Sequence, residues 1–305
     1  MKYPVIENIL PRESNQQIVL DNISKLIDEA IDFGTNLQKW QLEKNSNSDE
    51  NIVPILFFRN ILSVADGISV LIKNSSIDNA KSLVRVLMEN IFSLEYLLQE
   101  NTKNRALSYF VWNAHKDLKF LEQLNPNTES GKQFKSKIAK DRFVKDAEFK
   151  QHPKFVTAKK NAEELLKLPD YIAVEEEYQR TCTKKKNPNW FTLYDGPADF
   201  EQLSARVNLD MFYQLHYRTY SSNIHSTNVH KDVFFPNDDG TQDIIQIRYS
   251  KDCHAVSVDT INLLIVSFMT VIGKLLPEKN DDYLKWYFGF RDNYWKLQEA
   301  SQKSI

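Results

Sequence analysis

Apolar residues recur every three to four positions over most of the chain, which is the period of an α-helix. The pattern predicts one helix over about 14–42, a second over about 53–73 and a third over about 78–99. The third segment is apolar on almost every side except along Arg85 and Glu89. Because a helix that is apolar nearly all round belongs in a core, we expect this one at the centre of the fold.

The helical period continues beyond residue 100. Further helices are predicted over about 102–124, 209–225, 254–276 and 279–297. The apolar VFF and the alternating IIQIRY flank a turn of Asn, Asp and Gly residues, a pattern that is typical of a β-hairpin. We therefore expect an all-α, multi-helix bundle with one small β-hairpin insertion near 233–249.

The polar run KNSNSDE at 44–50 has the composition of a linker and suggests how the chain divides. We expect residues 1–48 to form an N-terminal helix followed by this linker. Residues 49–277 would form the helical core domain that contains the hairpin. Residues 278–305 would form a C-terminal helix packed on that core.

Composition and charge narrow the function classes. Only 7 glycines and 10 prolines occur in 305 residues, and this scarcity of turn formers favours helices over strands. A net charge of -2 excludes a globally basic nucleic-acid binder but leaves room for a local basic face. Residues 132–160 carry ten Lys or Arg against three acidic residues, and the lysines of a predicted loop at 180–189 would extend this surface. Such a segment is either a solvated face or a nucleic-acid contact.

The sequence favours a cytoplasmic protein without a membrane span. Its two cysteines have no metal-ligand spacing, which is simplest in a reducing compartment. The first residues lack the apolar stretch of a signal peptide. The most apolar later stretch is interrupted by Asp259, Asn262 and Lys274, so we expect it to be a buried core helix.

One stripe of the predicted helix over 209–225 combines apolar and chemically active side chains. Residues at spacings of four, three, four and three fall on one helix face, and here they are Met211, Leu215, Arg218, Ser222 and His225. Ser221 lies three positions after Arg218. The stripe predicts a helix that passes from the core into a polar pocket. It is either a satisfied structural cluster or a site where guanidinium and imidazole contact a phosphate or sugar.

Arg85 and Glu89 are one turn apart on the apolar third helix, where a charge is tolerated only with a partner. We expect a buried pair that either locks helix packing or orients the Arg218 and His225 cluster. His225, His230 and Glu89 together suggest a metal site, but no metal-binding motif is present, so we expect no metal and no cofactor. Phosphate-binding Gly-rich loops and hydrolase elbows are also missing from the sequence.

Three segments carry a resemblance to a known family. They are SLVRVLMEN at 82–90, Trp190 followed by a short helix ending in LSARVN, and YRTYSSNIH at 217–225. In this order they resemble the bacterial domain of unknown function 5677 family, over roughly residues 50–275. The resemblance marks Arg85, Glu89, Tyr217, Arg218, Ser221 and His225.

Arg218 and His225, separated by six residues, are also similar to the R-x(4-6)-H motif of HEPN ribonucleases, which are helical RNA-cleaving proteins of bacterial defence and toxin systems. Those proteins usually carry Asn, Asp or His directly after the arginine, where this chain has Thr219. The resemblance implies an arginine and a histidine that act on an RNA phosphodiester.

Two hypotheses follow. The first is a metal-independent ribonuclease or an RNA- or nucleotide-binding effector in phage defence or a toxin system, with His225 as general acid/base and Arg218 stabilising phosphate charge. The second is a non-enzymatic interaction protein whose polar cluster is a buried network. RNA, a nucleotide, a second copy of the chain or a partner protein are the expected partners. The supporting residues are Arg85, Glu89, Tyr217, Ser221, Ser222 and His230.

Overall fold

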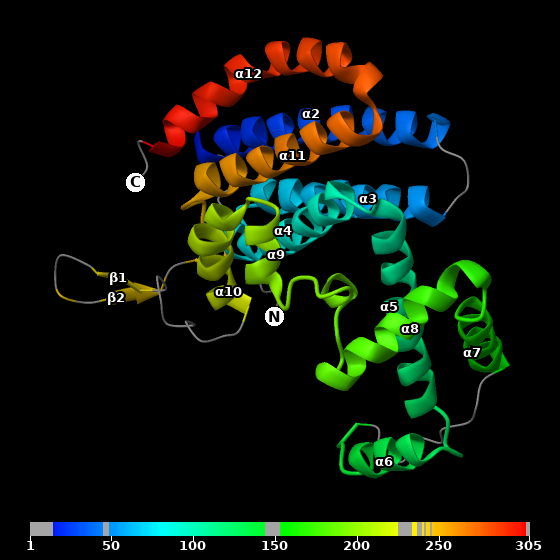
Figure 1. Cartoon of the computed structure of the whole chain (residues 1–305). Coiled ribbons are helices and arrows are strands. Elements are labelled where there is room, and N and C mark those ends of the chain that lie inside the picture. Colours follow the sequence, from blue (N-terminus) through cyan, green and yellow to red (C-terminus); the bar gives the residue numbers. More distant parts are fainter. Residues whose placement is uncertain are drawn as a thin grey trace. The chain divides into compact units, whose positions relative to one another are not determined.

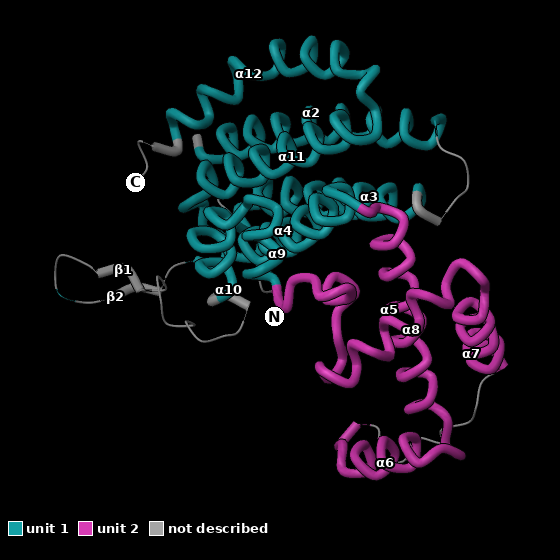
Figure 2. The backbone as a smooth tube through the Cα atoms, in the orientation of Figure 1, with its two compact units in different colours: residues 1–100, 200–305 teal, residues 101–199 magenta. Residues whose placement is uncertain are grey.

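The computed structural model describes residues 15–44, 49–143, 153–224, 234–236, 240, 242–244 and 246–302 (Figure 1). The chain divides into two compact units (Figure 2). Unit 1 consists of residues 1–100 and 200–305, and unit 2 of residues 101–199. These units differ from the three segments expected from the sequence, because unit 2 is inserted within the stretch 49–277 and both ends of the chain belong to unit 1.

Unit 1 is built on four long helices. They are α2 (Asn15–Lys44), α3 (Asp49–Lys73), α4 (Ile77–Gln99) and α11 (Cys253–Leu275). Helix α3 packs between α2 and α4, and α11 contacts all three (Figure 1). Phe58, Phe92 and Phe268 are fully buried among them. Burying each such ring contributes about 1.5–3 kcal/mol relative to an exposed one.

The C-terminal helix α12 (Asn280–Gln302) follows the short turn η3 (Pro277–Lys279) and packs against α11 and α2 (Figure 1). Trp286 stacks on Phe33 of α2, with ring centroids 4.3 Å apart and planes 9° from parallel. Phe290 is fully buried beside Trp286. Aromatic packing therefore holds this helix against the core of unit 1.

Two helices of unit 1, at Asn51–Lys73 and Cys253–Leu275, are long and apolar enough to cross a membrane by length and composition. The core helix of a soluble protein passes the same test. In their most apolar windows 44% and 61% of the residues are buried inside the structure. Helix α11, the more buried of the two, carries the buried Asp259 that interrupts its apolar sequence.

Unit 2 is arranged around α5 (Thr102–Gln123). The helices α6 (Glu129–Ile138), α7 (Pro153–Leu165) and α8 (Pro169–Lys184) and the 3-10 turn η1 (Trp190–Thr192) all pack against α5. A small apolar core joins α5 to α8 through Leu107, Val111, Tyr171 and Val174, with Leu193 beside them.

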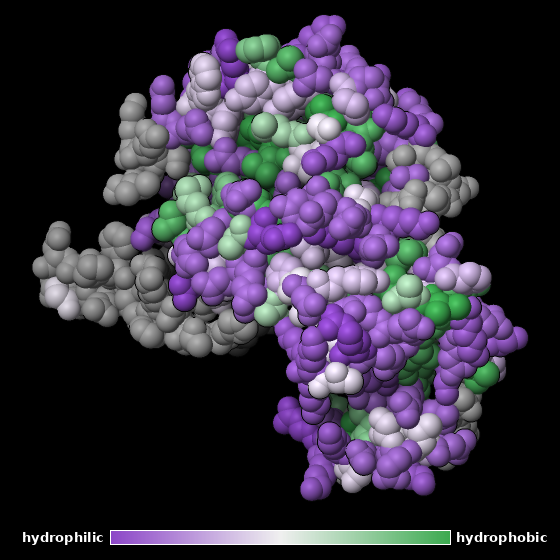
Figure 3. Space-filling view, viewed as in Figure 1, coloured by the Kyte–Doolittle hydropathy of each residue, from purple (hydrophilic) through white to green (hydrophobic). Residues whose placement is uncertain are grey.

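The described residues of the predicted basic segment 132–160 lie on α6, in the turn after it and on α7, and α7 buries none of its residues. On the face drawn in Figure 3, hydrophilic residues cover most of unit 2. The predicted loop at 180–189 is wrong in its first half, because α8 continues to Lys184.

The remaining elements of unit 1 lie against α4. Helix α9 (Phe200–Arg206), the π-helical turn η2 (Phe212–Tyr217) and helix α10 (Arg218–Ile224) all contact it. The helix predicted over 209–225 is therefore two elements, a π-helical turn that runs into an α-helix.

Two three-residue strands, β1 (Phe234–Pro236) and β2 (Gln242–Ile244), pair antiparallel, with Phe235 opposite Asp243. The alternating segment 244–249 predicts a longer strand, but β2 ends at Ile244. Residues 246–250 bend instead, and the backbone N–H of Tyr249 donates to the carbonyl of Ser75, 3.0 Å away. This contact ties the segment to the turn before α4.

Candidate functional site

The turn η2 and helix α10 place aromatic side chains toward the core of unit 1. Tyr217 and Tyr220 are 8% and 7% exposed. Met211 and Leu215, which the sequence pattern predicts to face the core, are 59% and 61% exposed. The prediction that the apolar end of this stripe lies in the core is therefore wrong. Tyr213, Tyr217 and Tyr220 have the same four-and-three spacing, and these larger rings occupy the buried side.

Tyr217 joins the two charged residues of α4. The Nη2 group of Arg85 donates to the Tyr217 hydroxyl at 2.9 Å, and that hydroxyl donates to Oε1 of Glu89 at 2.8 Å. Arg85 and Glu89 also form the ion pair that the sequence predicts, at 3.3 Å, with side chains 19% and 29% exposed. The guanidinium lies 4.8 Å from the centre of the Tyr217 ring, within cation-π range. The three side chains form one closed network.

The electrostatics of this network keep Tyr217 protonated. Burial raises the pKa of Tyr217 to about 12, and Glu89 adds to the rise while Arg85 opposes it. A tyrosine with such a pKa donates a hydrogen bond at neutral pH and does not act as a base. The buried Nε of Arg85 has no hydrogen-bond partner among the described residues. The network therefore holds α4 against η2, with one donor of Arg85 left over.

A second polar cluster, which the sequence does not predict, connects η2 and α10 to the middle of α11. Oδ2 of Asp259 accepts from the Tyr220 hydroxyl at 2.6 Å and lies 2.7 Å from Nδ1 of His216. The hydrogen bond to Asp259 raises the pKa of His216 against the opposing effect of burial. Burial and Asp259 both raise the pKa of Tyr220. A carboxylate on an otherwise apolar helix requires partners, and that is the signal in the sequence that points to this cluster.

The predicted catalytic arginine lies outside both clusters. Arg218 is exposed, and its Nη1 donates to Oε1 of Gln214 at 2.9 Å. Ser221 is half-buried. His225 and His230 lie outside the described residues, as does the side chain of Ser222. The structure brings Arg85, Glu89 and Tyr217 together and leaves the Arg218 guanidinium at the surface.

The described part of the chain contains no group of three His, Cys, Asp or Glu side chains close enough to hold a metal ion. The site as described is thus a set of hydrogen-bonded side chains with one exposed guanidinium. It can bind an anion at Arg218 and can maintain the packing of η2 on α4 and α11.

A comparison with protein families gives one match. The family model described as "Family of unknown function (DUF5677)" matches residues 51–242, which is more than half of the chain. We found no match to the chain among curated proteins or among solved structures. The matched region contains α4, η2 and α10, the elements that carry Arg85, Glu89, Tyr217 and Arg218. The chain belongs to the DUF5677 family.

Proposed function

We propose that this protein is an RNA-binding effector that cleaves RNA without a metal ion, with Arg218 and His225 as its active residues. The observation that carries the proposal is the exposure of Arg218 between two buried, hydrogen-bonded tyrosines. Tyr217 and Tyr220, on either side of Arg218 in sequence, are buried and hydrogen-bonded to α4 and α11. The guanidinium is therefore presented to solvent from a fixed backbone.

The chemistry of the two side chains suits a phosphodiester. A guanidinium binds two phosphate oxygens at once and stabilises the charge that develops on phosphorus oxygens. An imidazole exchanges protons near neutral pH, so His225, directly after the end of α10 at Ile224, can serve as general base or acid. The proposed step uses the ribose 2′-hydroxyl as nucleophile. Its oxygen bonds to phosphorus, its proton passes to the base, and the 5′-oxygen of the next nucleotide leaves and is protonated.

The charge distribution supports an RNA partner. Unit 2 carries 19 Lys and Arg against 14 Asp and Glu, whereas unit 1 carries 20 against 27. The formal charge of -2 for the whole chain conceals this difference. A basic unit within a chain of nearly neutral formal charge provides a local surface for phosphates.

The alternative function is that of a non-enzymatic interaction protein. The observation that favours it is the closed network of Arg85, Tyr217 and Glu89, in which the tyrosine hydroxyl is both acceptor and donor. Side chains that bind one another in this way serve packing. Under this alternative Arg218 is an ordinary exposed arginine, and a second copy of the chain or a partner protein takes the place of RNA.

The test compares Arg218→Ala and His225→Ala with the parent protein on a labelled single-stranded RNA in the presence of a chelator. We expect each variant to lower the cleavage rate by about 100-fold or more, with an unchanged melting temperature. The product should end in a 2′,3′-cyclic phosphate, and a 2′-deoxy substrate should remain intact. Arg206→Ala, an exposed arginine of α9, is the matched control and should cleave normally.

Two results would contradict the proposal. One is a parent protein that leaves RNA intact under all these conditions. The other is a cleavage that survives in both variants or disappears with the chelator. Intact RNA with the parent protein would favour the interaction protein, and the other result would place the cleavage on different residues or on a metal ion. If the activity is present, expression of the parent protein in a bacterial cytoplasm should arrest growth, as expected of an effector in phage defence or a toxin system, and neither variant should do so.

A further inference from the structure

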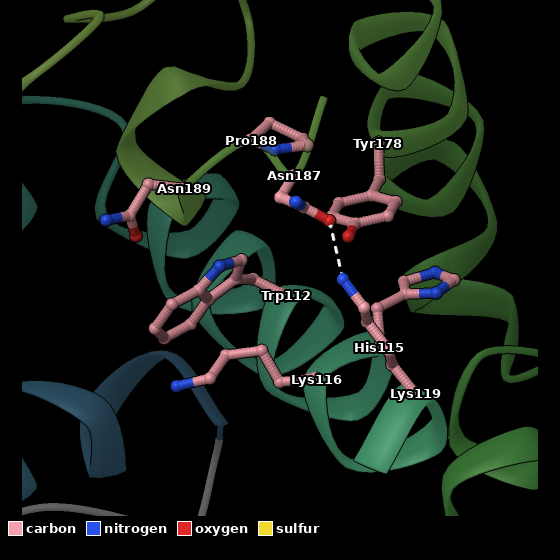
Figure 4. Close-up of a pocket in the computed structure, with 8 residues that line it drawn as sticks. All are labelled: Trp112, His115, Lys116, Lys119, Tyr178, Asn187, Pro188 and Asn189. Carbon is pink, nitrogen blue, oxygen red and sulfur yellow. Dashed lines mark hydrogen bonds between the residues drawn. The ribbon is translucent and has the colours of Figure 1, made fainter. Parts of the chain in front are cut away.

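A pocket in unit 2 contains none of the residues of the two polar clusters described above. One of its walls is a single face of α5, where Trp112, His115, Lys116 and Lys119 are spaced by three, one and three residues (Figure 4). Tyr178 of α8 and the loop of Asn187, Pro188 and Asn189 complete the lining. The volume is about 290 Å³. That is at the lower end of the range for small-molecule pockets, and it suits a ligand the size of one nucleotide.

The aromatic side chains of the pocket are fixed by their neighbours. The ring of His115 stacks on that of Tyr178, with centroids 4.1 Å apart and planes 3° from parallel. Nε2 of His115 lies 2.6 Å from Oε2 of Glu175, which holds the imidazole in place. Trp112 and Tyr178 are both half-buried. The stacked rings of His115 and Tyr178 therefore form a preordered wall of the pocket beside Trp112.

The charged side chains lie at the exposed part of the same pocket. Lys116 and Lys119 are both exposed, and the described structure pairs neither with a carboxylate. The ammonium of Lys116 lies 4.2 Å from the centre of the Trp112 ring. The ammonium of Lys119 donates to Oδ1 of Asn187 at 2.9 Å (Figure 4), which leaves its other two N–H groups for a ligand. Two cations beside a half-buried indole attract an anion that carries a flat ring.

We propose that this pocket binds one nucleotide, with its base stacked on Trp112 and its phosphate held by Lys116 and Lys119. Stacking on an aromatic side chain combined with lysine contacts to phosphate is how proteins hold single nucleotides of an unpaired strand. The amide of Asn187 lies beside Lys119, where it can hydrogen-bond to the ligand. The nucleotide is either a free nucleoside monophosphate or one unit of a single-stranded RNA.

The proposed nucleotide site goes beyond the proposed cleavage activity and does not depend on it. All its residues belong to unit 2, whereas Arg218 and His225 belong to unit 1. Arg218→Ala should therefore leave nucleotide binding unchanged. Loss of cleavage with retained nucleotide binding, or loss of binding with retained cleavage, would show that the two proposals stand or fall separately.

The experiment measures binding of adenosine monophosphate and of a short oligoadenylate RNA to the full chain by calorimetry at low salt. We expect Trp112→Leu and Lys119→Gln each to weaken binding by about tenfold or more, with unchanged melting temperatures. Lys135→Gln, an exposed lysine of α6 away from the pocket, is the matched control and should bind like the parent. Adenosine alone and inorganic phosphate alone should bind at least about tenfold more weakly than the monophosphate, because each supplies half of the contacts.

The two ligands identify the source of the nucleotide. Trp112-dependent binding of the monophosphate supports a free nucleotide, and Trp112-dependent binding of the RNA alone supports a strand that inserts one base. Absence of binding for both ligands would overturn the proposal. Binding that Trp112→Leu and Lys119→Gln leave unchanged would overturn it as well.

Discussion

The Tyr217 hydroxyl lies within hydrogen-bonding distance of both charged residues of α4. It accepts from Arg85 and donates to Glu89 over 2.9 and 2.8 Å, and its ring covers the guanidinium. An arginine and a glutamate one turn apart could pair without it. The tyrosine converts this local pair on α4 into a connection between α4 and η2.

Tyr217→Phe removes one hydroxyl and leaves the ring in place. Nη2 of Arg85 then loses its acceptor, while Nε already lacks a partner among the described residues, and Glu89 loses a donor. We expect the free energy of unfolding to fall by about 1–3 kcal/mol, as when partly buried polar groups lose their partners. Urea denaturation followed by circular dichroism measures the change.

Tyr287→Phe on α12 is the matched control. No hydrogen bond of the Tyr287 hydroxyl is found in the described structure, so its removal should change stability by less than about 0.5 kcal/mol. If Tyr217→Phe proves as stable as the parent protein, the hydrogen bonds of the network contribute nothing to the fold.

At the scale of elements, the joint between η2 and α11 depends on one carboxylate. Asp259 is 7% exposed and binds both His216 and Tyr220. The short elements η2 and α10 contain too few residues to be stable alone. Their placement therefore relies on Tyr217 on one side and on Asp259 on the other.

The joint should weaken as pH rises. Because the hydrogen bond to Asp259 raises the pKa of His216, the protonated histidine stabilises the fold most fully below its unfolded-state pKa of about 6.5. This contribution disappears as pH rises through the raised pKa of the folded state. His216→Gln should therefore lower the melting temperature more at about pH 5.5 than at about pH 8.5. An equal loss at both pH values, or a larger one at the higher pH, would contradict this assignment.

The sequence predicts the long helices well and their faces less well. The segments 78–99 and 254–276 are apolar and regular, and the structure has α4 and α11 within a residue of them. Met211 and Leu215 are exposed instead of buried, since the helical period alone cannot decide between an aliphatic and an aromatic face. The contacts of Tyr217 with α4 and of Tyr220 with α11 determine which face is buried.

The sequence pattern does not predict contacts between residues that are far apart in the sequence. Asp259 of α11 binds His216 of η2 and Tyr220 of α10. In the sequence, the segment that contains β1 and β2 separates α10 from α11. The pocket of unit 2 has a local signal, the shared face of Trp112, His115 and Lys119 on α5. Its other wall comes from α8 and the loop before η1, which no local pattern connects to α5.

At the scale of the whole molecule, the inserted residues 101–199 form a separate unit whose net charge is opposite in sign to that of unit 1. Unit 2 has an excess of five positive charges and unit 1 an excess of seven negative ones. Unit 1 is assembled from residues 1–100 and 200–305, which are not contiguous in the sequence. The hydrophobic period is a local property of the chain, so it does not reveal this division. Each unit has its own apolar core.

RNA binding is the claim on which the account of function rests, and its most direct test is the affinity of the full chain for a labelled single-stranded RNA as a function of salt concentration. We predict measurable binding at low salt, with the logarithm of the affinity falling linearly as the logarithm of the salt concentration rises, because lysines and arginines release counterions from phosphates. Absence of binding at low salt, or an affinity that salt does not change, would contradict the account.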